Sequence, residues 1–270
     1  MSEIQHTQNI PQTLGLIGFG EVGHEISRAY ENGFLPGYRL VAVLTRNKPK
    51  TTIPEDARWL PDLNDFLNAG LNVVVEAASA DAVKVYANTI LRTGPDLITL
   101  SAAAFADSFF EAEIRETLVT SPGRLIIPSG AIGGLDAVSS AMTGGVKRVV
   151  LTQRKPPTSL LPAEEARQIR SSKLLSEGTA REAALKFPKN ANIAAALGIA
   201  GPGMDNVIVR VVADPRVSRN TAELNVEGEF GCMRVVLENE PSRNMRTSRL
   251  TSMAIIATLV RRTAKLICPA

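Results

Sequence analysis

The chain has 270 residues, of which 44% are hydrophobic and 21% charged, so it can bury one large core or two modest ones. Its formal net charge is +3, the Lys and Arg residues are scattered among nearly as many acids, and only 4% of residues are aromatic. Nucleic-acid surfaces need clustered cations, often with stacking aromatics, so we expect no nucleic-acid partner.

The cysteines and the N-terminal segment indicate the compartment. Cys232 and Cys268 are the only cysteines, too few and too far apart for a disulfide framework or a zinc cluster, so no metal is expected. Residues 1–12 are polar and lack the charged-then-apolar order of a signal peptide, and we expect them to form a flexible lead. No apolar run approaches the ~20 residues that span a bilayer. The sequence therefore favours a cytoplasmic protein with no membrane partner.

The first half alternates short apolar runs with amphipathic stretches. Strands are expected over residues 13–18, 38–45, 72–79, 96–102 and 124–130, with helices between them, the first over 21–33. Continuous apolar strands separated by helices are typical of a parallel sheet covered on both faces. The fold class is therefore α/β, with a doubly wound Rossmann domain over residues 13–130.

The second half is richer in alternating patterns, which favour antiparallel strands. Strands are expected over 146–157, 206–215 and 221–239, and helices over 178–188 and 190–200. We interpret residues 131–243 as an α+β domain for substrate binding and dimerisation. Residues 244–270 contain a further helix with its own apolar face, expected to pack back on the Rossmann domain.

A glycine motif follows the first strand. It reads Gly18, Phe19, Gly20, Glu21, Val22 and Gly23, and a helix follows it. Gly18 allows a tight turn, Gly20 lets backbone approach a pyrophosphate, and Gly23 permits close packing of helix and strand. The helix N-terminus offers free N–H groups to phosphates. A turn that merely connects strand to helix is the alternative, but the surrounding strand–turn–helix unit favours dinucleotide binding.

The end of the second strand bears on the choice of cofactor. An NAD site usually has an acid there, whereas this strand ends in Thr45 and Arg46. Arg46 could pair with a 2′-phosphate, or it could be a solvated loop arginine. With the acid missing, NADP is favoured over NAD. Ala78 and Ser79, after the third strand, are small enough to leave room for a nicotinamide ribose.

Several stretches resemble the L-aspartate dehydrogenases in order and spacing. They are IPSGAIGGLDAV (127–138), TQRKPP (152–157), residues 177–201, ADP (213–215) and NMRTSRL (244–250). The resemblance implies a homodimer with an active site between the two domains of each chain. It also implies NAD- or NADP-dependent oxidation of L-aspartate to iminoaspartate and the reverse reductive amination, so the partner is a small amino acid, keto acid or imine.

The resemblance also implies roles for individual residues. Ala131 and Asn192 match cofactor contacts near the nicotinamide, although Asn192 could instead cap the helix that follows it. Among the candidate substrate-binding residues, Lys155 is the best placed to bind a carboxylate or assist catalysis, and the others are Ser129, Thr247 and Ser248.

The chain departs from the family at the catalytic position. The family's general acid/base histidine is matched by Ala222, which has no proton to give. His6 and His24 are the only histidines, and neither is placed to substitute. A natural variant or an engineered substitution would explain the alanine. Glu223 is a weaker replacement, because strand alternation turns it to the opposite face.

Three functions remain open on the sequence alone. The first is an NAD(P)-dependent dehydrogenase like aspartate dehydrogenase, weakened by the missing histidine, since general acid–base help is worth about 10²–10⁴ in rate. The second is an imine reductase that acts on a different amine or imine. The third is a dinucleotide-binding protein with little catalysis.

Overall fold

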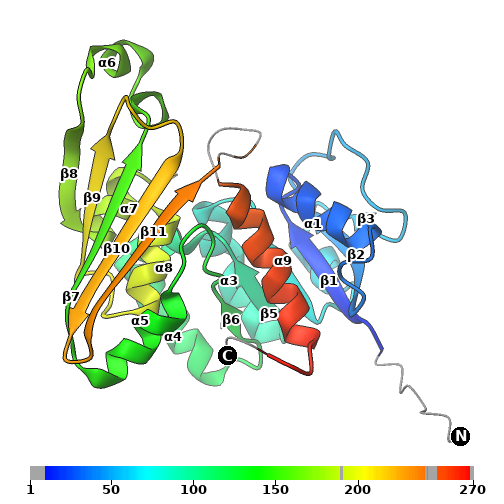
Figure 1. Cartoon of the computed structure of the whole chain (residues 1–270). Coiled ribbons are helices and arrows are strands. Elements are labelled where there is room, and N and C mark those ends of the chain that lie inside the picture. The colour runs from blue at the N-terminus through cyan, green and yellow to red at the C-terminus, as the bar shows by residue number, and fades with distance from the viewer. Residues whose placement is uncertain (1–9, 189–190, 241, 243–247, 268–270) are drawn as a thin grey trace, which may run out of the picture.

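The computed structural model describes residues 10–188, 191–240, 242 and 248–267. Two sheets form the framework, a six-stranded sheet in the order β3-β2-β1-β4-β5-β6 and a five-stranded sheet in the order β11-β10-β7-β9-β8 (Figure 1). The predicted fold class is confirmed: a doubly wound α/β unit is followed by an α+β unit.

All neighbouring strands of the first sheet are parallel. They are β1 (Gln12–Ile17), β2 (Tyr38–Leu44), β3 (Arg58–Trp59), β4 (Val73–Glu76), β5 (Asp96–Thr99) and β6 (Leu125–Ile126). Every residue of β4 and β5 is buried, which explains why the sequence shows unbroken apolar runs there. The last predicted strand is much shorter than expected, and β3 was not predicted.

Helices cover both faces of this sheet (Figure 1). They are α1 (Glu21–Glu31), α2 (Leu63–Leu67), α3 (Ala80–Thr93), the 3₁₀ helix η1 (Ala102–Ala106) and α4 (Ser108–Thr120). Ser79 begins α3 by accepting from the N–H of Ala82, and Gly94 ends it in a left-handed conformation. Asp107 likewise begins α4, because its side chain accepts from the N–H groups of Phe109 and Phe110.

The second sheet is mixed. Its strands are β7 (Val146–Lys155), β8 (Lys173–Thr179), β9 (Val207–Ala213), β10 (Asn220–Gly228) and β11 (Gly231–Asn239). The predicted antiparallel pairing is found for β10 with β7 and β11 and for β8 with β9. Strands β7 and β9 are parallel, and the chain passes through β8 and several helices between them.

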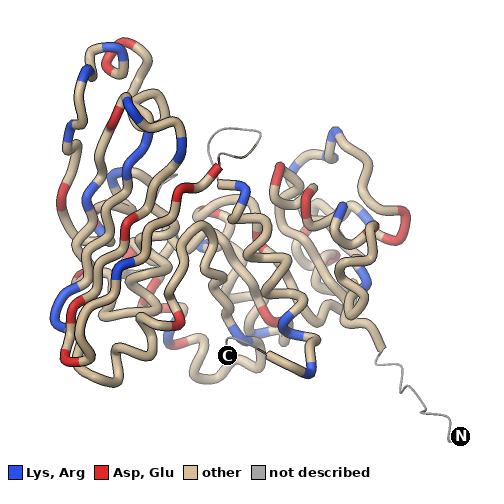
Figure 2. Tube along the Cα trace, viewed as in Figure 1, with Lys and Arg blue, Asp and Glu red and all other residues tan. Residues whose placement is uncertain are grey.

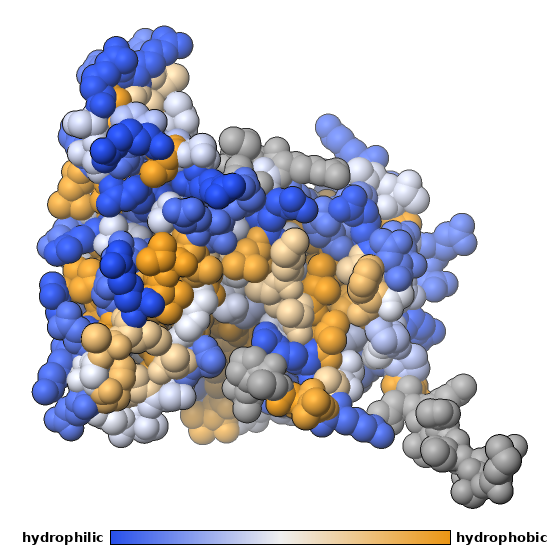
Figure 3. All heavy atoms as spheres, in the orientation of Figure 1, coloured by the Kyte–Doolittle hydropathy of each residue, from blue (hydrophilic) through white to orange (hydrophobic). Residues whose placement is uncertain are grey.

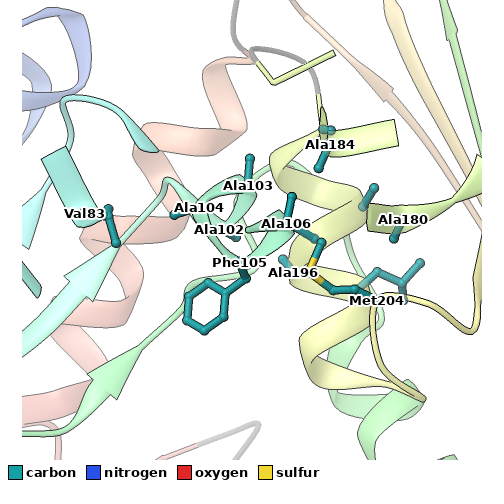
Figure 4. Packing of buried hydrophobic residues seen from close by; sticks show 14 of the residues in the cluster. Val83, Ala102, Ala103, Ala104, Phe105, Ala106, Ala180, Ala184, Ala196 and Met204 are labelled. Atoms are coloured by element: carbon teal, nitrogen blue, oxygen red, sulfur yellow. The ribbon is translucent and has the colours of Figure 1, made fainter. Parts of the chain in front are cut away.

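The remaining helices belong to the second half of the chain. They are α5 (Leu135–Ala141), η2 (Met142–Gly144), η3 (Pro157–Ser159), α6 (Ala163–Gln168), α7 (Ala180–Lys186), α8 (Asn192–Ala200) and α9 (Arg249–Thr263). Helix η1 packs against α7 and α8 through small side chains, and Figure 4 shows its alanines facing Ala180, Ala184 and Ala196. Alanines let these backbones approach closely, so α7 and α8 of the second unit are held tightly against η1 of the first.

Helix α9 returns the chain to the first sheet, where it packs against α1. The hydroxyl of Tyr38 donates to the carbonyl of Leu259 at 3.0 Å. The Arg262 guanidinium lies 2.6 Å from the carboxylate of Asp96, which also pairs with Arg124 at 2.7 Å. The C-terminal helix is therefore anchored to β2 and β5 by buried polar contacts as well as by apolar packing.

Basic and acidic residues are interspersed along the described chain (Figure 2). Figure 2 shows basic and acidic residues interspersed along the strands of the second sheet and the loops of the first. Within the described ranges, no helix is both long and apolar enough to cross a bilayer.

Candidate active site

The glycine turn between β1 and α1 has the shape that a diphosphate requires. Gly18 has a φ of +88°, and a Cβ there would lie 2.8 Å from the Cβ of Ala78. A Cβ on Gly23 would lie 2.5 Å from the carbonyl oxygen of Gly18, so this close approach of helix and turn needs glycine. A Cβ on Gly20 would meet nothing within 4 Å. The turn thus leaves open space in front of the N-terminus of α1, which fits a dinucleotide's phosphates.

A cavity of about 380 Å³ lies beside this turn. Its lining includes the predicted residues Gly18, Thr45, Arg46, Ala78 and Ser79, together with Asp81 and Tyr86, which were not predicted. Ala78 and Ser79, expected beside the nicotinamide ribose, thus line the same cavity as Arg46 and not the cavity that contains Ala131 and Asn192. Trp59 in β3 donates from its indole nitrogen to the hydroxyl of Thr45 at 3.1 Å. The short strand that the sequence did not reveal therefore holds the loop that carries Arg46.

A second cavity, of about 90 Å³, lies between the two sheets. Its lining combines residues after β5 and β6 with residues of β7, β10, β11, α8 and the start of α9, and includes Ala102, Ser129, Gly130, Ala131, Gln153, Lys155, Asn192, Asn220, Ala222, Asn239 and Ser248. The structure therefore brings together the predicted residues Ser129, Ala131, Lys155, Asn192, Ala222 and Ser248.

The pairing of β7 with β10 determines which side chains face this cavity. Ala222 is paired with Gln153, and both are buried. Lys155 lies two residues beyond Gln153 and shares its face, because strand side chains alternate. Glu223 has the opposite orientation, as predicted, and pairs with Arg234 at 3.0 Å.

Asn192 connects the second unit to the first. Its side-chain oxygen accepts a hydrogen bond from the backbone N–H of Ala103, in η1, at 3.0 Å. The alternative interpretation as a helix cap is wrong: α8 starts at Asn192 itself, Ala191 occupies the cap position, and no side-chain cap is formed. The acceptor role is instead long-range, across 89 residues of sequence.

Asn239 supports the backbone on the other side of the cavity. Its side-chain nitrogen donates to the carbonyl of Ala131 at 2.9 Å. This contact stabilises an irregular segment in which Gly130 and Gly134 both have positive φ. This role could not be predicted from the sequence, because it depends on the pairing of β11 with β10.

Lys155 has an altered protonation equilibrium. It lies at the end of β7, and burial of its side chain lowers the pKa of the ammonium group to about 8. Because a charged amine is disfavoured away from water, this lysine gives up its proton nearer to neutrality than an exposed lysine does. It can therefore present either a cation or a neutral amine to a ligand in the cavity.

Other predicted residues lie at the edges of the site. Phe19, Glu21 and Val22 belong to the glycine turn and the first turn of α1 but are not among the residues that line the two cavities. His24 is also in α1, with its ring centroid 5.9 Å from that of Phe19, and it lines neither cavity.

His6 and Thr247 lie outside the described residues. In the part of the chain that is described, no group of His, Cys, Asp and Glu side chains is arranged to hold a metal ion.

Comparison with known proteins gives the same organisation. Residues 18–128 match the sequence model described as homoserine dehydrogenase, NAD binding domain, and residues 136–262 match that of aspartate dehydrogenase, C-terminal. The L-aspartate dehydrogenase of Archaeoglobus fulgidus is 41% identical over 243 residues, which cover 90% of this chain and 94% of that protein. That of Methanosarcina mazei is 36% identical over 263 residues, covering 91% of this chain and 95% of that protein.

A solved structure agrees with these relatives. The crystal structure of aspartate dehydrogenase from Thermotoga maritima superposes with a TM-score of 0.77 at 31% identity, covering 95% of this chain and 98% of that chain. The chain belongs to the L-aspartate dehydrogenase family, oxidoreductases that act on CH–NH₂ donors with a nicotinamide dinucleotide.

Proposed function

We propose that the chain is an NADP-preferring dehydrogenase that interconverts a small acidic amino acid, L-aspartate in the first instance, with its imine. The observation that carries this proposal is the cavity between the sheets, where Lys155, Asn192 and Ala222 meet beside the edge of the nucleotide-binding sheet. The names of the relatives support aspartate as the substrate.

The cofactor would be held by residues of the first unit. The turn from Gly18 to Gly23 would receive the pyrophosphate, and Arg46 would pair with the 2′-phosphate of NADP. Ala131 and Asn192 would flank the nicotinamide end. When bound, a nicotinamide dinucleotide accepts a hydride from the substrate carbon or returns one to it.

Lys155 would bind a carboxylate of the substrate. An ammonium ion that is partly shielded from water attracts a carboxylate more strongly than an exposed one does. Ser129 and Ser248 line the same cavity and would donate hydrogen bonds to the carboxylates, and we assign Thr247 the same role from the sequence alone. These contacts would hold the reacting carbon in place for hydride transfer.

Ala222 removes proton-transfer help from the steps that interconvert an amino acid with its keto acid. Oxidation of an amino acid removes a proton from its ammonium group as well as a hydride from carbon, and hydrolysis of the imine requires further proton transfers. Ala222 can assist none of these steps. A preformed iminium ion, in contrast, becomes a neutral amine on accepting a hydride alone. The alanine therefore favours a second candidate function, an imine reductase whose imine forms outside the protein.

We also propose that residues 131–243, together with the adjoining face of α9, carry the contacts of a homodimer. Strand β11 is at the edge of its sheet, so its backbone groups are open to another strand. Figure 3 shows apolar side chains gathered over β11 and α9, and Val236, Met253 and Val260 are exposed there. A second copy of this chain would bury this surface and pair the free edge of β11.

The cofactor preference is tested by Arg46→Ala. We expect the dissociation constant of NADP⁺ to rise about 10- to 100-fold, because a charged hydrogen-bonded pair of about 1.5–3 kcal/mol is lost. The dissociation constant of NAD⁺ should change by less than about threefold, since NAD⁺ has no 2′-phosphate for Arg46 to bind. Arg39→Ala, an exposed arginine at the other end of β2, is the matched control. An equal loss of affinity for NADP⁺ and NAD⁺ would contradict the assignment of Arg46 to the 2′-phosphate. Calorimetry of each cofactor gives the comparison.

Catalysis is tested by Ala222→His. With aspartate as substrate, we expect turnover to rise about 10²–10⁴-fold, the usual contribution of a general acid/base. Ala222→Leu adds bulk without a titrating group and should give no gain. Reduced-cofactor absorbance is followed with aspartate, with oxaloacetate plus ammonia, and with cyclic imines, using both NAD(H) and NADP(H).

The outcomes of this panel separate the candidate functions. Reduction of cyclic imines without any reaction of aspartate or oxaloacetate, even in Ala222→His, would favour the imine reductase. Cofactor binding without turnover on any substrate would leave only a binding function.

The role of Lys155 predicts a pH dependence. Its lowered pKa means that the ammonium charge is present below about pH 8 and is lost above it. The KM for oxaloacetate should therefore rise about tenfold between pH 7 and pH 9, following the fraction of charged lysine. Lys155→Arg keeps its charge and should show a flat KM over this range. A wild-type KM that stays constant would rule out the carboxylate contact.

The dimer is tested by sedimentation velocity. The wild-type chain should sediment as a dimer, and Val236→Glu should shift it towards the monomer by placing a charge in the apolar contact. Val119→Glu changes an equally apolar but unrelated exposed site on α4 and should leave the dimer intact. A monomeric wild-type chain would disprove the interface.

A further inference from the structure

Glu76 is a buried acid that the proposed reaction does not use. It is the last residue of β4, and only 1% of it is exposed. Its Oε1 accepts from the backbone N–H groups of Ala78 and Ser79, both at 2.7 Å, and from the Ser101 hydroxyl at 3.2 Å. Its Oε2 accepts from the Thr99 hydroxyl at 2.6 Å. Both carboxylate oxygens thus accept hydrogen bonds.

Folding stability does not explain why an acid occupies this buried position. Burial raises the pKa of the Glu76 carboxyl, and the four hydrogen bonds oppose that rise. All four donors are neutral, so none of them offsets the cost of burying the carboxyl group with a positive charge. A buried polar group costs folding free energy that an apolar residue would not. Such a residue is expected where function requires it.

The donors belong to two separate turns. Ala78 and Ser79 form the turn from β4 to α3 and line the cavity that contains Arg46. Thr99 and Ser101 belong to the turn from β5 to η1, and the residues beside them, Leu100 and Ala102, line the cavity that contains Lys155 and Ala222.

Further contacts connect each turn to its cavity. The N–H of Ser101 donates back to the Thr99 hydroxyl at 3.0 Å, and the Ser79 hydroxyl caps α3. Two residues beyond Ser101, the N–H of Ala103 binds Asn192. One carboxylate therefore connects the turn at the adenosine end of the site to the turn at its nicotinamide end.

We propose that Glu76 is a positioning residue that sets the spacing of these two turns, so that both ends of one dinucleotide are bound together. This inference rests on the dinucleotide site of the proposed function but not on the substrate or on turnover. A ligand that occupies only the adenosine end needs one turn, and the complete cofactor needs both. Loss of the Glu76 contacts between the two turns should therefore weaken binding of the complete cofactor and leave binding of its adenosine fragment unchanged.

Glu76→Gln tests this selectivity. The glutamine oxygen can still accept from Ala78 and Ser79, whereas its NH₂ group can only donate to the Thr99 hydroxyl, so the short hydrogen bond from Thr99 to the carboxylate is replaced by a weaker one in the opposite direction. We expect the affinity for NADP⁺ to fall at least about tenfold, a loss of about 1.4 kcal/mol, while the affinity for adenosine 2′,5′-bisphosphate stays within about twofold. Binding is measured by calorimetry and by the fluorescence of Trp59, the single tryptophan, which contacts Thr45 at the adenosine end.

Thr99→Val provides the same test without changing the acid. It removes the shorter of the two hydroxyl contacts that join Glu76 to the second turn, the longer one being from Ser101, and it leaves both backbone donors of the first turn in place. The same selective loss of NADP⁺ binding is expected. Thr99→Ser keeps the hydroxyl and should bind NADP⁺ as tightly as the wild-type chain. Thr117→Val, at another buried threonine whose hydroxyl is hydrogen-bonded to Arg92, is the matched control.

The outcomes are distinct. Equal weakening of NADP⁺ and the fragment, or no weakening of either in a folded Thr99→Val chain, overturns the positioning role. A selective loss of affinity for NADP⁺ supports the positioning role even if the chain turns over no amine or imine. Absence of turnover would count only against the proposed function. Failure of the wild-type chain to bind NADP⁺ would overturn both.

Discussion

Parallel pairing of the six strands of the first sheet is the constraint on which the cofactor site depends. Because β1, β2, β4 and β5 all run in one direction, the glycine turn, Arg46, Ser79 and Ser101 follow strand ends at the same edge. Strand order reverses between β1 and β4, and ligands of such sheets bind at this point of reversal. Glu76 ends β4 at that point, so a single side chain reaches the loops of two adjacent strands.

The second sheet completes the site because small residues let it approach. The alanines of η1 pack directly on α7 and α8, which places Asn192 within hydrogen-bond distance of Ala103. This approach closes the small cavity around Lys155 and Ala222, and the same closure dehydrates Lys155 and lowers its pKa. Packing between the units therefore determines both the shape of the cavity and the chemistry available in it.

The sequence predicts those features that depend on neighbouring residues. Apolar runs, the glycine turn and the basic residue after β2 are local signals, and they identify the Rossmann unit and its cofactor side. The strands β3 and β8 were missed because one is two residues long and the other is a partly exposed edge strand. Asn239 and Glu76 could not be assigned, because their roles arise from contacts between segments distant in sequence.

A crystal structure of the chain with NADP⁺ and oxaloacetate tests the central claim most directly. That claim is that one dinucleotide extends from the glycine turn to the cavity between the sheets. We expect the pyrophosphate over Gly20, the 2′-phosphate beside Arg46, and the nicotinamide between Asn192 and Ala222, with a carboxylate on Lys155. A dinucleotide whose nicotinamide lies outside this cavity, or a carboxylate bound away from Lys155, would contradict the arrangement.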